Sequence, residues 1–362
     1  MKRQAQKQHE AERRAQHTEV DEGGRPAIPQ WLGQRRARVA LGGIIGLAGI
    51  GGAFFLPANK EATQEEDPVA RAVQDVVGER TAEAHVVEWD LPNLDHERVD
   101  FWMERFTTVP DMRERMEGFL QRAGIYVPML LEKLDERGMP RDLIYLAMIE
   151  SGFEPQAYSH AHAAGLWQFI AETGRRYGLA IDRAVDERND PVRATDAALD
   201  YLEELYERFD SWYLAAAAYN TGENRVGRIM RETFGREKAR SEDEYYQIWP
   251  RLPRETRDYV PLMIAAGRIG KEPAKYGFDH VIPDPPLEYH EVMVPPATEL
   301  GAIARAAGVA IEDIRRLNPH FRLNRTPNNR DYQVRLPPGS LRQFASSWGL
   351  NLGPEVERAL TE

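Results

Sequence analysis

The chain has 362 residues, a formal net charge of −11 and no cysteine. The length exceeds that of one ordinary domain, which holds roughly 100–200 residues, and the acidic balance argues against a general nucleic-acid binder. The lack of cysteine excludes disulfides, thiolate metal sites and a lipoprotein anchor, which is built on a cysteine.

Positive charge gathers at the N-terminus. Residues 1–38 hold nine Lys/Arg and five Asp/Glu, a local balance of +4, which leaves −15 for the remainder. The run Val39–Leu56 that follows has no charged residue, and as a helix it would span about 27 Å, close to a bilayer core of about 30 Å. A basic block before an apolar run is typical of a cytoplasmic N-terminus. The sequence therefore predicts a basic tail over 1–38 and a transmembrane helix over 39–56, with a cleaved signal peptide as the alternative.

A charged linker, poor in aromatic residues, is predicted over 57–88. From 89 to about 275 the chain is predicted to be mainly α, since no convincing alternation of strands occurs there. Apolar spacing predicts helices over residues 100–106, 112–123, 125–137, 141–151, 191–210, 212–219, 225–233 and 255–269. The helix over 141–151 is largely apolar, so the side chain of Glu150 lies at the end of a buried helix.

The C-terminal part has a different pattern. Prolines at 283, 285 and 286 indicate a linker. A strand is predicted over Tyr289–Val294, helices over Thr298–Ala307 and Ala310–Leu317, and a second strand over Tyr332–Leu336. This βααβ order predicts a small module over 286–340, followed by a partly helical tail over 341–362.

Glu150 is the first candidate for chemistry. Burial disfavours the carboxylate form and raises the pKa of a glutamate, which suits a general acid for glycosidic-bond cleavage near neutral pH. Taken alone, however, Glu150 is better explained as a structural glutamate that caps or pairs.

Three further segments carry the aromatic and amide groups that sugar sites commonly combine. They are Gly165-Leu166-Trp167-Gln168, Ala218-Tyr219-Asn220 and Glu255–Pro261, which includes Tyr259. Each alone is weak, because Trp-Gln usually packs in a core and Tyr-Asn-Thr-Gly usually ends a helix.

Other acids and histidines are weaker candidates than Glu150. Glu154, Glu172, Glu223, Asp182, Asp186 and Asp190 lie in predicted polar loops or at helix ends. His160 and His162 lack a third ligand at a recognisable spacing, so they are expected at the surface, and no metal or cofactor is expected.

In their order and spacing, Glu150-Ser151 and the three segments resemble the soluble-lytic-transglycosylase family, in particular its membrane-bound D type, over about Trp89–Ile269. The resemblance implies a lysozyme-like helical catalytic domain over 89–275. It also implies that Glu150 is the catalyst, that Ser151 positions it or the substrate, and that Tyr259 hydrogen-bonds its carboxyl group. Gln168, Tyr219 and Asn220 are implied to line the sugar cleft.

The implied reaction cleaves the β-1,4 bond between N-acetylmuramic acid and N-acetylglucosamine in peptidoglycan strands, without water. Glu150 protonates the leaving oxygen and then takes the proton from the C6 hydroxyl, which closes a 1,6-anhydro ring. Ordinary glycosidases need two carboxylates, whereas here the substrate supplies the nucleophile. A lysozyme- or chitosanase-type hydrolase and an inactive glycan-binding scaffold are the alternatives. The implied location is the periplasmic side of the inner membrane.

The βααβ order and the segment Ile314–Pro319 resemble a LysM repeat, a module that binds N-acetylglucosamine-containing glycans. The usual Gly-Asp-Thr after the first strand is replaced here by Pro296-Ala297-Thr298. A small domain that only braces the catalytic one is therefore an equally good interpretation.

Overall fold

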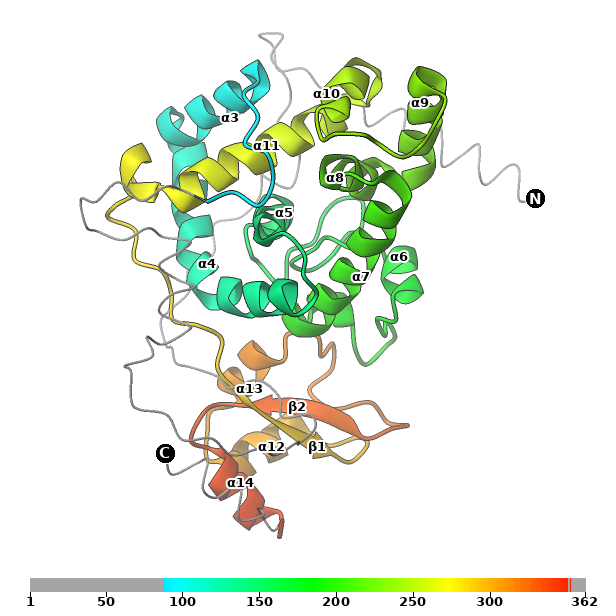
Figure 1. The fold of residues 1–362 in the computed structure, drawn as a ribbon. Coiled ribbons are helices and arrows are strands. Elements are labelled where there is room, and N and C mark those ends of the chain that lie inside the picture. Colours follow the sequence, from blue (N-terminus) through cyan, green and yellow to red (C-terminus); the bar gives the residue numbers. More distant parts are fainter. Residues whose placement is uncertain (1–87, 351, 353–362) are drawn as a thin grey trace, which may run out of the picture. The chain divides into compact units, whose positions relative to one another are not determined.

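The computed structural model describes residues 88–350 and 352 (Figure 1). The apolar run Val39–Leu56 lies outside the described residues. Within the described residues, no helix is both long enough and apolar enough to cross a membrane.

The described chain up to Tyr276 is helical, as the sequence predicts. Figure 1 shows helices packed around one another, with only isolated β-bridges between loops. The helices are α3 (Glu97–Thr108), α4 (Pro110–Glu136), η2 (Arg141–Leu143), α5 (Ile144–Ser151), α6 (Ala171–Arg176), η3 (Glu187–Asn189), α7 (Pro191–Phe209), α8 (Trp212–Thr221), α9 (Glu223–Phe234), α10 (Glu244–Ile248), η4 (Trp249–Arg251), α11 (Arg254–Lys271) and η5 (Pro273–Tyr276).

Helix α4 differs from the sequence prediction. Two helices were expected, over 112–123 and 125–137, but the structure has one continuous helix that passes through Gly124. A Cβ atom on Gly124 would lie 2.0 Å from the carbonyl oxygen of Asp284, so glycine allows the linker to pack directly on the helix. The amide of Asp284 donates to the carbonyl of Gln121 at 2.8 Å. Glycine inside a helix costs about 1 kcal/mol relative to alanine, and this close contact explains its presence.

Helix α5 lies in the core of the helical domain, in contact with α4 and α11. Leu146, Ala147 and Met148 are fully buried in it. The helix ends at Gly152, whose backbone is left-handed with φ of 62°, a conformation that glycine adopts at little cost. A Cβ atom there would lie 2.1 Å from the ring of Phe119. Packing and backbone geometry therefore end the helix one turn after Ala147 and place Glu150 in its last turn.

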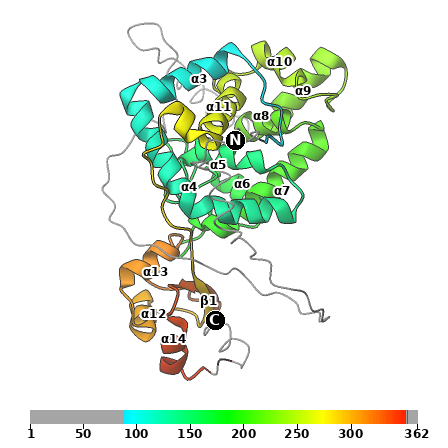
Figure 2. The same cartoon turned by 60° about the vertical axis from the view of Figure 1, so that its left-hand side comes forward.

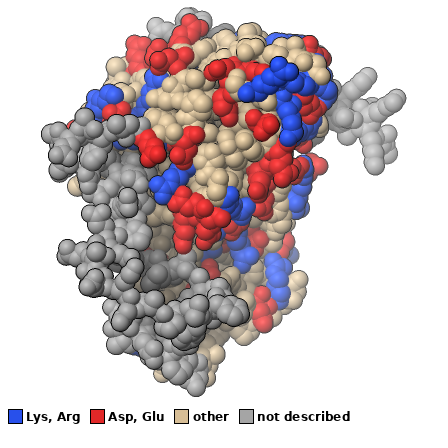
Figure 3. Space-filling model, in the orientation of Figure 1, with Lys and Arg blue, Asp and Glu red and all other residues tan. Residues whose placement is uncertain are grey.

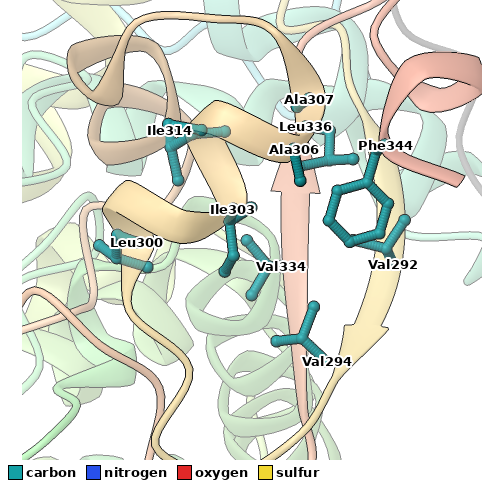
Figure 4. Close-up of a cluster of buried hydrophobic side chains, with 11 residues drawn as sticks. Val292, Val294, Leu300, Ile303, Ala306, Ala307, Ile314, Val334, Leu336 and Phe344 are labelled. Carbon is teal, nitrogen blue, oxygen red and sulfur yellow. The ribbon is translucent and has the colours of Figure 1, made fainter. Parts of the chain in front are cut away.

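The C-terminal module has the predicted βααβ order. Strands β1 (His290–Val294) and β2 (Tyr332–Leu336) pair antiparallel, with Val292 opposite Val334. Helices α12 (Leu300–Ala307) and α13 (Ile311–Leu317) connect them, and α14 (Leu341–Ser347) follows; Figure 2 gives a second view of these helices. Figure 4 shows that Ile303 and Phe344 pack with the strand residues in a small apolar core. A core of this size gives a module of about 60 residues only marginal stability.

Buried charges join the C-terminal module to the helical domain, and we call this cluster the seam. Arg335 Nη2 lies 2.8 Å from Asp190 Oδ1, and Tyr332 donates its hydroxyl proton to Glu187 Oε1 at 2.5 Å. The amide of Asp186 donates to the carbonyl of His320 at 2.8 Å. The seam consists of Asp186, Glu187, Arg188 and Asp190 from the helical domain and His320, Arg322, Tyr332 and Arg335 from the module.

The seam corrects the interpretation of two acids. The sequence placed Asp186 and Asp190 in a polar loop, yet their residues are only 3% and 0% exposed. Buried acids need partners, and theirs include arginines contributed by the distant module, which local sequence patterns do not reveal. These contacts favour the bracing interpretation of the module.

Candidate active site

The side chain of Glu150 meets the side chain of Tyr259 where α5 contacts α11. The Tyr259 hydroxyl donates to Glu150 Oε1 at 2.5 Å. This is the contact that the family resemblance implies. Tyr259 is 6% exposed, so the phenol approaches the carboxyl group from the core side and fixes its orientation.

The electrostatics of the site favour a protonated Glu150. Burial raises the pKa of Glu150 to about 8, the hydrogen bond from Tyr259 lowers it, and the negative charge of Glu255 raises it. Burial is the largest of these effects, because the carboxylate loses more hydration than the neutral acid. At neutral pH the group can therefore donate a proton, as a general acid must.

Ser151 and Tyr219 hold one loop against the core. We call residues 157–170 the motif loop, since they contain Gly165-Leu166-Trp167-Gln168. The hydroxyl of Ser151 donates to the carbonyl of Leu166 at 2.8 Å, and the hydroxyl of Tyr219 donates to the carbonyl of Trp167 at 2.8 Å. Both side chains thus tie the motif loop to the helices that surround Glu150.

Gln168 stabilises the motif loop from within. Its side-chain amide donates to the carbonyls of Gly165 at 2.9 Å and Ala157 at 3.2 Å, and its backbone is left-handed with φ of 48°. The amide oxygen is the group left to accept a hydrogen bond from a sugar hydroxyl.

Arg188 is a residue that the sequence analysis missed. Its guanidinium donates to the carbonyls of Phe169 at 2.9 Å and His162 at 2.8 Å. A Cβ atom on Gly165 would lie 1.7 Å from the carbonyl oxygen of Arg188, so the two backbones are in direct contact. The seam that holds Arg188 therefore also supports the motif loop. Arg188 directly follows Asp186 and Glu187 in the sequence, and this was the only local sign that it is paired.

Asn220 joins two helices of the site. Its side-chain oxygen accepts a hydrogen bond from the Thr256 hydroxyl at 2.8 Å, which connects the end of α8 to the start of α11. Tyr219 packs its ring 5.2 Å from that of Tyr201, a second residue that the sequence analysis missed because it lies within the apolar stripe of α7.

The other acids lie in different surroundings. Glu154 and Glu172 are exposed, and Glu223 accepts a hydrogen bond from Tyr201 at 3.2 Å. His160 and His162 are exposed, as predicted. In the part of the chain that the structure describes, no three His, Asp or Glu residues are grouped as metal ligands.

Two family models match the chain. Residues 130–241 match the Transglycosylase SLT domain, and residues 288–348 match the LysM-like domain of lytic transglycosylase MltD. The first segment contains Glu150, Gln168, Tyr219 and Asn220, and the second contains the whole βααβ unit.

Similar proteins carry related names. The chain is 37% identical over 198 residues to membrane-bound lytic murein transglycosylase D of Escherichia coli (strain K12), a match that covers 54% of this chain and 43% of that protein. It is 35% identical over 114 residues to peptidoglycan transglycosylase gp16 of Escherichia phage T7, covering 31% of this chain and 9% of that protein. A putative tributyltin chloride resistance protein of Alteromonas sp. (strain M-1) is 41% identical over 110 residues, covering 30% of this chain and 53% of that protein. The chain thus spans about half or less of the length of these relatives.

Among solved structures, an inactive mutant of the lytic transglycosylase Slt from Pseudomonas aeruginosa aligns with a TM-score of 0.34 and 24% identity. The alignment covers 46% of this chain and 26% of that one.

Proposed function

We propose that this chain, which contains a transglycosylase SLT domain and an MltD-type LysM-like domain, is a peptidoglycan lytic transglycosylase. It cleaves the β-1,4 bond between N-acetylmuramic acid and N-acetylglucosamine and leaves a 1,6-anhydro end. The observation that carries the proposal is the hydrogen bond from Tyr259 to Glu150, which lies within the segment that matches the SLT domain.

Glu150 acts first as an acid and then as a base. With a pKa of about 8, its carboxyl group is mostly protonated at neutral pH and transfers its proton to the leaving glycosidic oxygen. The bond between the anomeric carbon and that oxygen breaks as the proton is transferred. The resulting carboxylate then accepts the proton of the C6 hydroxyl while the C6 oxygen bonds to the anomeric carbon. The 1,6-anhydro ring is thereby closed, and Glu150 regains its proton. Tyr259 stabilises the carboxylate between the two steps by donating its hydrogen bond.

The remaining residues bind and orient the strand. Asn220 and Gln168 present amide groups to sugar hydroxyls, and Tyr219 contributes an aromatic face. Ser151 positions the motif loop, and with it the substrate's acetamido group, relative to Glu150. These assignments draw support from the hydrogen bonds of Ser151, Gln168 and Tyr219 to carbonyls of the motif loop. Asn220 follows Tyr219 directly and is held by Thr256 of α11.

A lysozyme- or chitosanase-type hydrolase is the second candidate. It would need a second carboxylate to activate water. The buried acids Asp186 and Asp190 are occupied in the seam by Arg188 and Arg335, which disfavours them in that role. A glycan-binding scaffold without activity is the third candidate, and the raised pKa of Glu150 disfavours it, since burying a carboxyl group without using it is costly.

The experiment that tests the proposal compares Glu150→Gln with Glu154→Gln on isolated cell-wall sacculi. Glu154 is a matched control because it is an exposed glutamate four residues further along the chain. We expect Glu150→Gln to lose about a thousandfold in rate, as loss of a general acid commonly costs two to four orders of magnitude. Glu154→Gln should stay close to wild type. Equal activity of Glu150→Gln and wild type would contradict the proposal.

The location follows from the same proposal. Peptidoglycan lies outside the cytoplasmic membrane, and the basic tail over 1–38 with the apolar run Val39–Leu56 suits a single anchoring helix with the catalytic domain in the periplasm. Alkaline extraction of membranes tests this, since an anchored protein stays in the pellet and a released one enters the supernatant.

A further inference from the structure

A groove of about 460 Å³ lies beside the motif loop. Its walls come from residues 158–162 and 170–175, from residues 181–188, and from Arg322 of the C-terminal module. Glu150 is not among the lining residues, so the groove is separate from the candidate catalytic carboxyl group. Its volume falls within the range of about 300–1,000 Å³ that is usual for ligand sites.

The groove is basic, although the chain as a whole is acidic. Arg175, Arg183, Arg188 and Arg322 line it, and Asp182 is the acid among its lining residues. By contrast, acidic and basic side chains are interspersed on the face of the molecule drawn in Figure 3. Four guanidinium groups around one groove therefore form a local exception that attracts anions.

Part of this positive charge is available to a ligand. Arg188 and Arg322 both bind the carboxylate of Asp186. Two positive groups share one negative group, so the three side chains together keep a net positive charge. Arg175 donates to the carbonyl of Ile181, which is neutral and leaves its charge uncompensated. Arg183 is exposed and makes no hydrogen bond or ion pair with any other described residue.

Asp182 weakens the positive field of the groove only slightly. One of its carboxylate oxygens accepts the amides of Ala184 and Val185 at 2.7 and 2.9 Å. The other lies 3.6 Å from Arg330. Arg330 therefore offsets the negative charge of Asp182, and the two amides fix the direction of its carboxylate.

The groove also exposes apolar surface. Tyr158 is 63% exposed and Ile170 is 42% exposed, and both belong to the small set of exposed large apolar side chains among the described residues. Both line the groove. Apolar side chains exposed together at a concave site indicate ligand binding. A ligand that fits must combine several carboxylates with aliphatic groups.

We propose that the groove binds the anionic stem peptide that muramic acid residues carry in peptidoglycan. This peptide joins alanine methyl groups and the aliphatic chain of a diamino acid with several free carboxylates. The proposal rests on the proposed function and deepens it, because it makes peptide-bearing strands the preferred substrate. The motif loop supplies the link between the two sites. On one side of the loop, the carbonyls of Leu166 and Trp167 accept hydrogen bonds from Ser151 and Tyr219, next to Glu150. Three other residues of the same loop line the groove, namely Tyr158, His162 and Ile170.

The test measures a ratio of two rates. Glycan strands with their stem peptides, and the same strands after an amidase has removed the peptides, are given to the full chain and to Arg183→Glu. Arg305→Glu is the control, since Arg305 is an exposed arginine of α12 outside the groove and the charge change is the same. We expect the ratio of peptide-bearing to stripped-strand rates to fall about fivefold or more in Arg183→Glu, as loss of a partly exposed charge-assisted contact predicts. Arg305→Glu should keep the wild-type ratio. An unchanged ratio in Arg183→Glu overturns the proposal.

A binding measurement separates this proposal from the proposed function. The free tripeptide L-alanyl-γ-D-glutamyl-diaminopimelate is titrated into the full chain, with neutral trialanine amide as the control ligand. Binding of the tripeptide that weakens in Arg183→Glu supports the groove, even if the wild-type protein cleaves neither kind of strand and the proposed function fails. No binding of the tripeptide, or equal binding of the neutral peptide, overturns the groove proposal while leaving the catalytic one standing.

Discussion

Tyr259 and Glu150 are 109 residues apart in the chain, yet the phenol oxygen of one lies 2.5 Å from the carboxyl oxygen of the other. The contact joins α11 to the last turn of α5. It orients the carboxyl group on which the proposed reaction depends and lowers the pKa of that group against the larger effect of burial. The first prediction follows from it.

Replacing Tyr259 by phenylalanine removes a hydrogen bond that favours the carboxylate form. The pKa of Glu150, which is about 8 with this bond present, should rise by about one unit, because a hydrogen bond to a charged group contributes about 1.5 kcal/mol. The alkaline limb of the activity profile, where the acid loses its proton, should move to higher pH by the same amount. The rate at the optimum should fall about tenfold, since the carboxyl group is no longer oriented.

Tyr245→Phe is the control for this profile. It removes an equally buried hydroxyl, which donates to the carbonyl of Thr256 at 3.0 Å and not to Glu150. It should leave the alkaline limb in place. A limb that stays fixed or moves to lower pH in Tyr259→Phe would show that the hydrogen bond does not act on the catalytic proton.

Glu150→Gln should stabilise the folded protein at alkaline pH. The pKa of Glu150 is raised to about 8 in the fold from an ordinary value of 4.5. The folded state therefore holds this proton more tightly than the unfolded chain, and stability is lost as pH rises from about 4.5 to 8. Glutamine does not titrate, so the free energy of unfolding of Glu150→Gln does not fall in this way. The variant should be only slightly more stable than wild type at pH 5 and more stable by roughly 1–3 kcal/mol at pH 8, or on the order of 5 °C in melting temperature. Thermal melts at both pH values check this, and an advantage that does not grow with pH contradicts it.

Arg335→Met should destabilise the protein strongly. Arg335 is 3% exposed and lies 2.8 Å from Asp190, which is fully buried. Its loss leaves that carboxylate with only the more distant Arg193, at 3.7 Å, as an arginine partner among the described residues. Breaking a buried ion pair from one side costs about 3–5 kcal/mol, which denaturant titration measures. Arg228→Met removes an arginine from an exposed pair with Glu232 and should leave the midpoint unchanged within error. Similar midpoints for the two variants would mean that the seam contributes little.

The pH dependence of stability should report on His320. Burial lowers the pKa of His320 to about 4 from an ordinary value of 6.5, although the nearby Asp190 partly opposes this. Below pH 6.5 the unfolded chain gains a proton that the folded state does not take up until about pH 4. The free energy of unfolding should therefore fall by up to about 3 kcal/mol across this window.

His320→Gln should flatten that slope, whatever its effect on stability at neutral pH. His280→Gln is the control, because His280 is 55% exposed and pairs only with Glu117 at 3.2 Å. Unfolding curves at pH 4, 5, 6 and 7 measure the slope. An equally steep slope in His320→Gln would assign the acid sensitivity to another group.

Local sequence patterns were enough to predict some parts of the fold. The apolar run before Glu150 predicted a buried helix, and alternation at Val292 and Val334 predicted the two strands that pair in the structure. In each case the signal lies within one element, where spacing alone decides which face is buried. The two-helix prediction around Gly124 was wrong because the glycine serves a contact with Asp284, 160 residues away in the sequence.

Long-range relationships were beyond such patterns. Asp190 and Arg335 are separated by 145 residues, and nothing near either position indicates that they meet. The direction of the Gln168 side chain could not be predicted from the sequence either. It depends on a left-handed backbone conformation that a non-glycine residue rarely adopts. The contact between Tyr259 and Glu150 was predicted only through the family resemblance, and not from the spacing of the residues.

The central claim is that Glu150 serves as acid and base while the substrate supplies its own nucleophile. The most direct test digests purified sacculi in water enriched in oxygen-18 and weighs the new muramic acid ends by mass spectrometry. The account predicts ends that are lighter by one water than reducing ends and free of the label, produced by the wild-type protein and not by Glu150→Gln. New reducing ends in place of anhydro ends would show that water attacks the anomeric carbon, and would contradict the proposed mechanism.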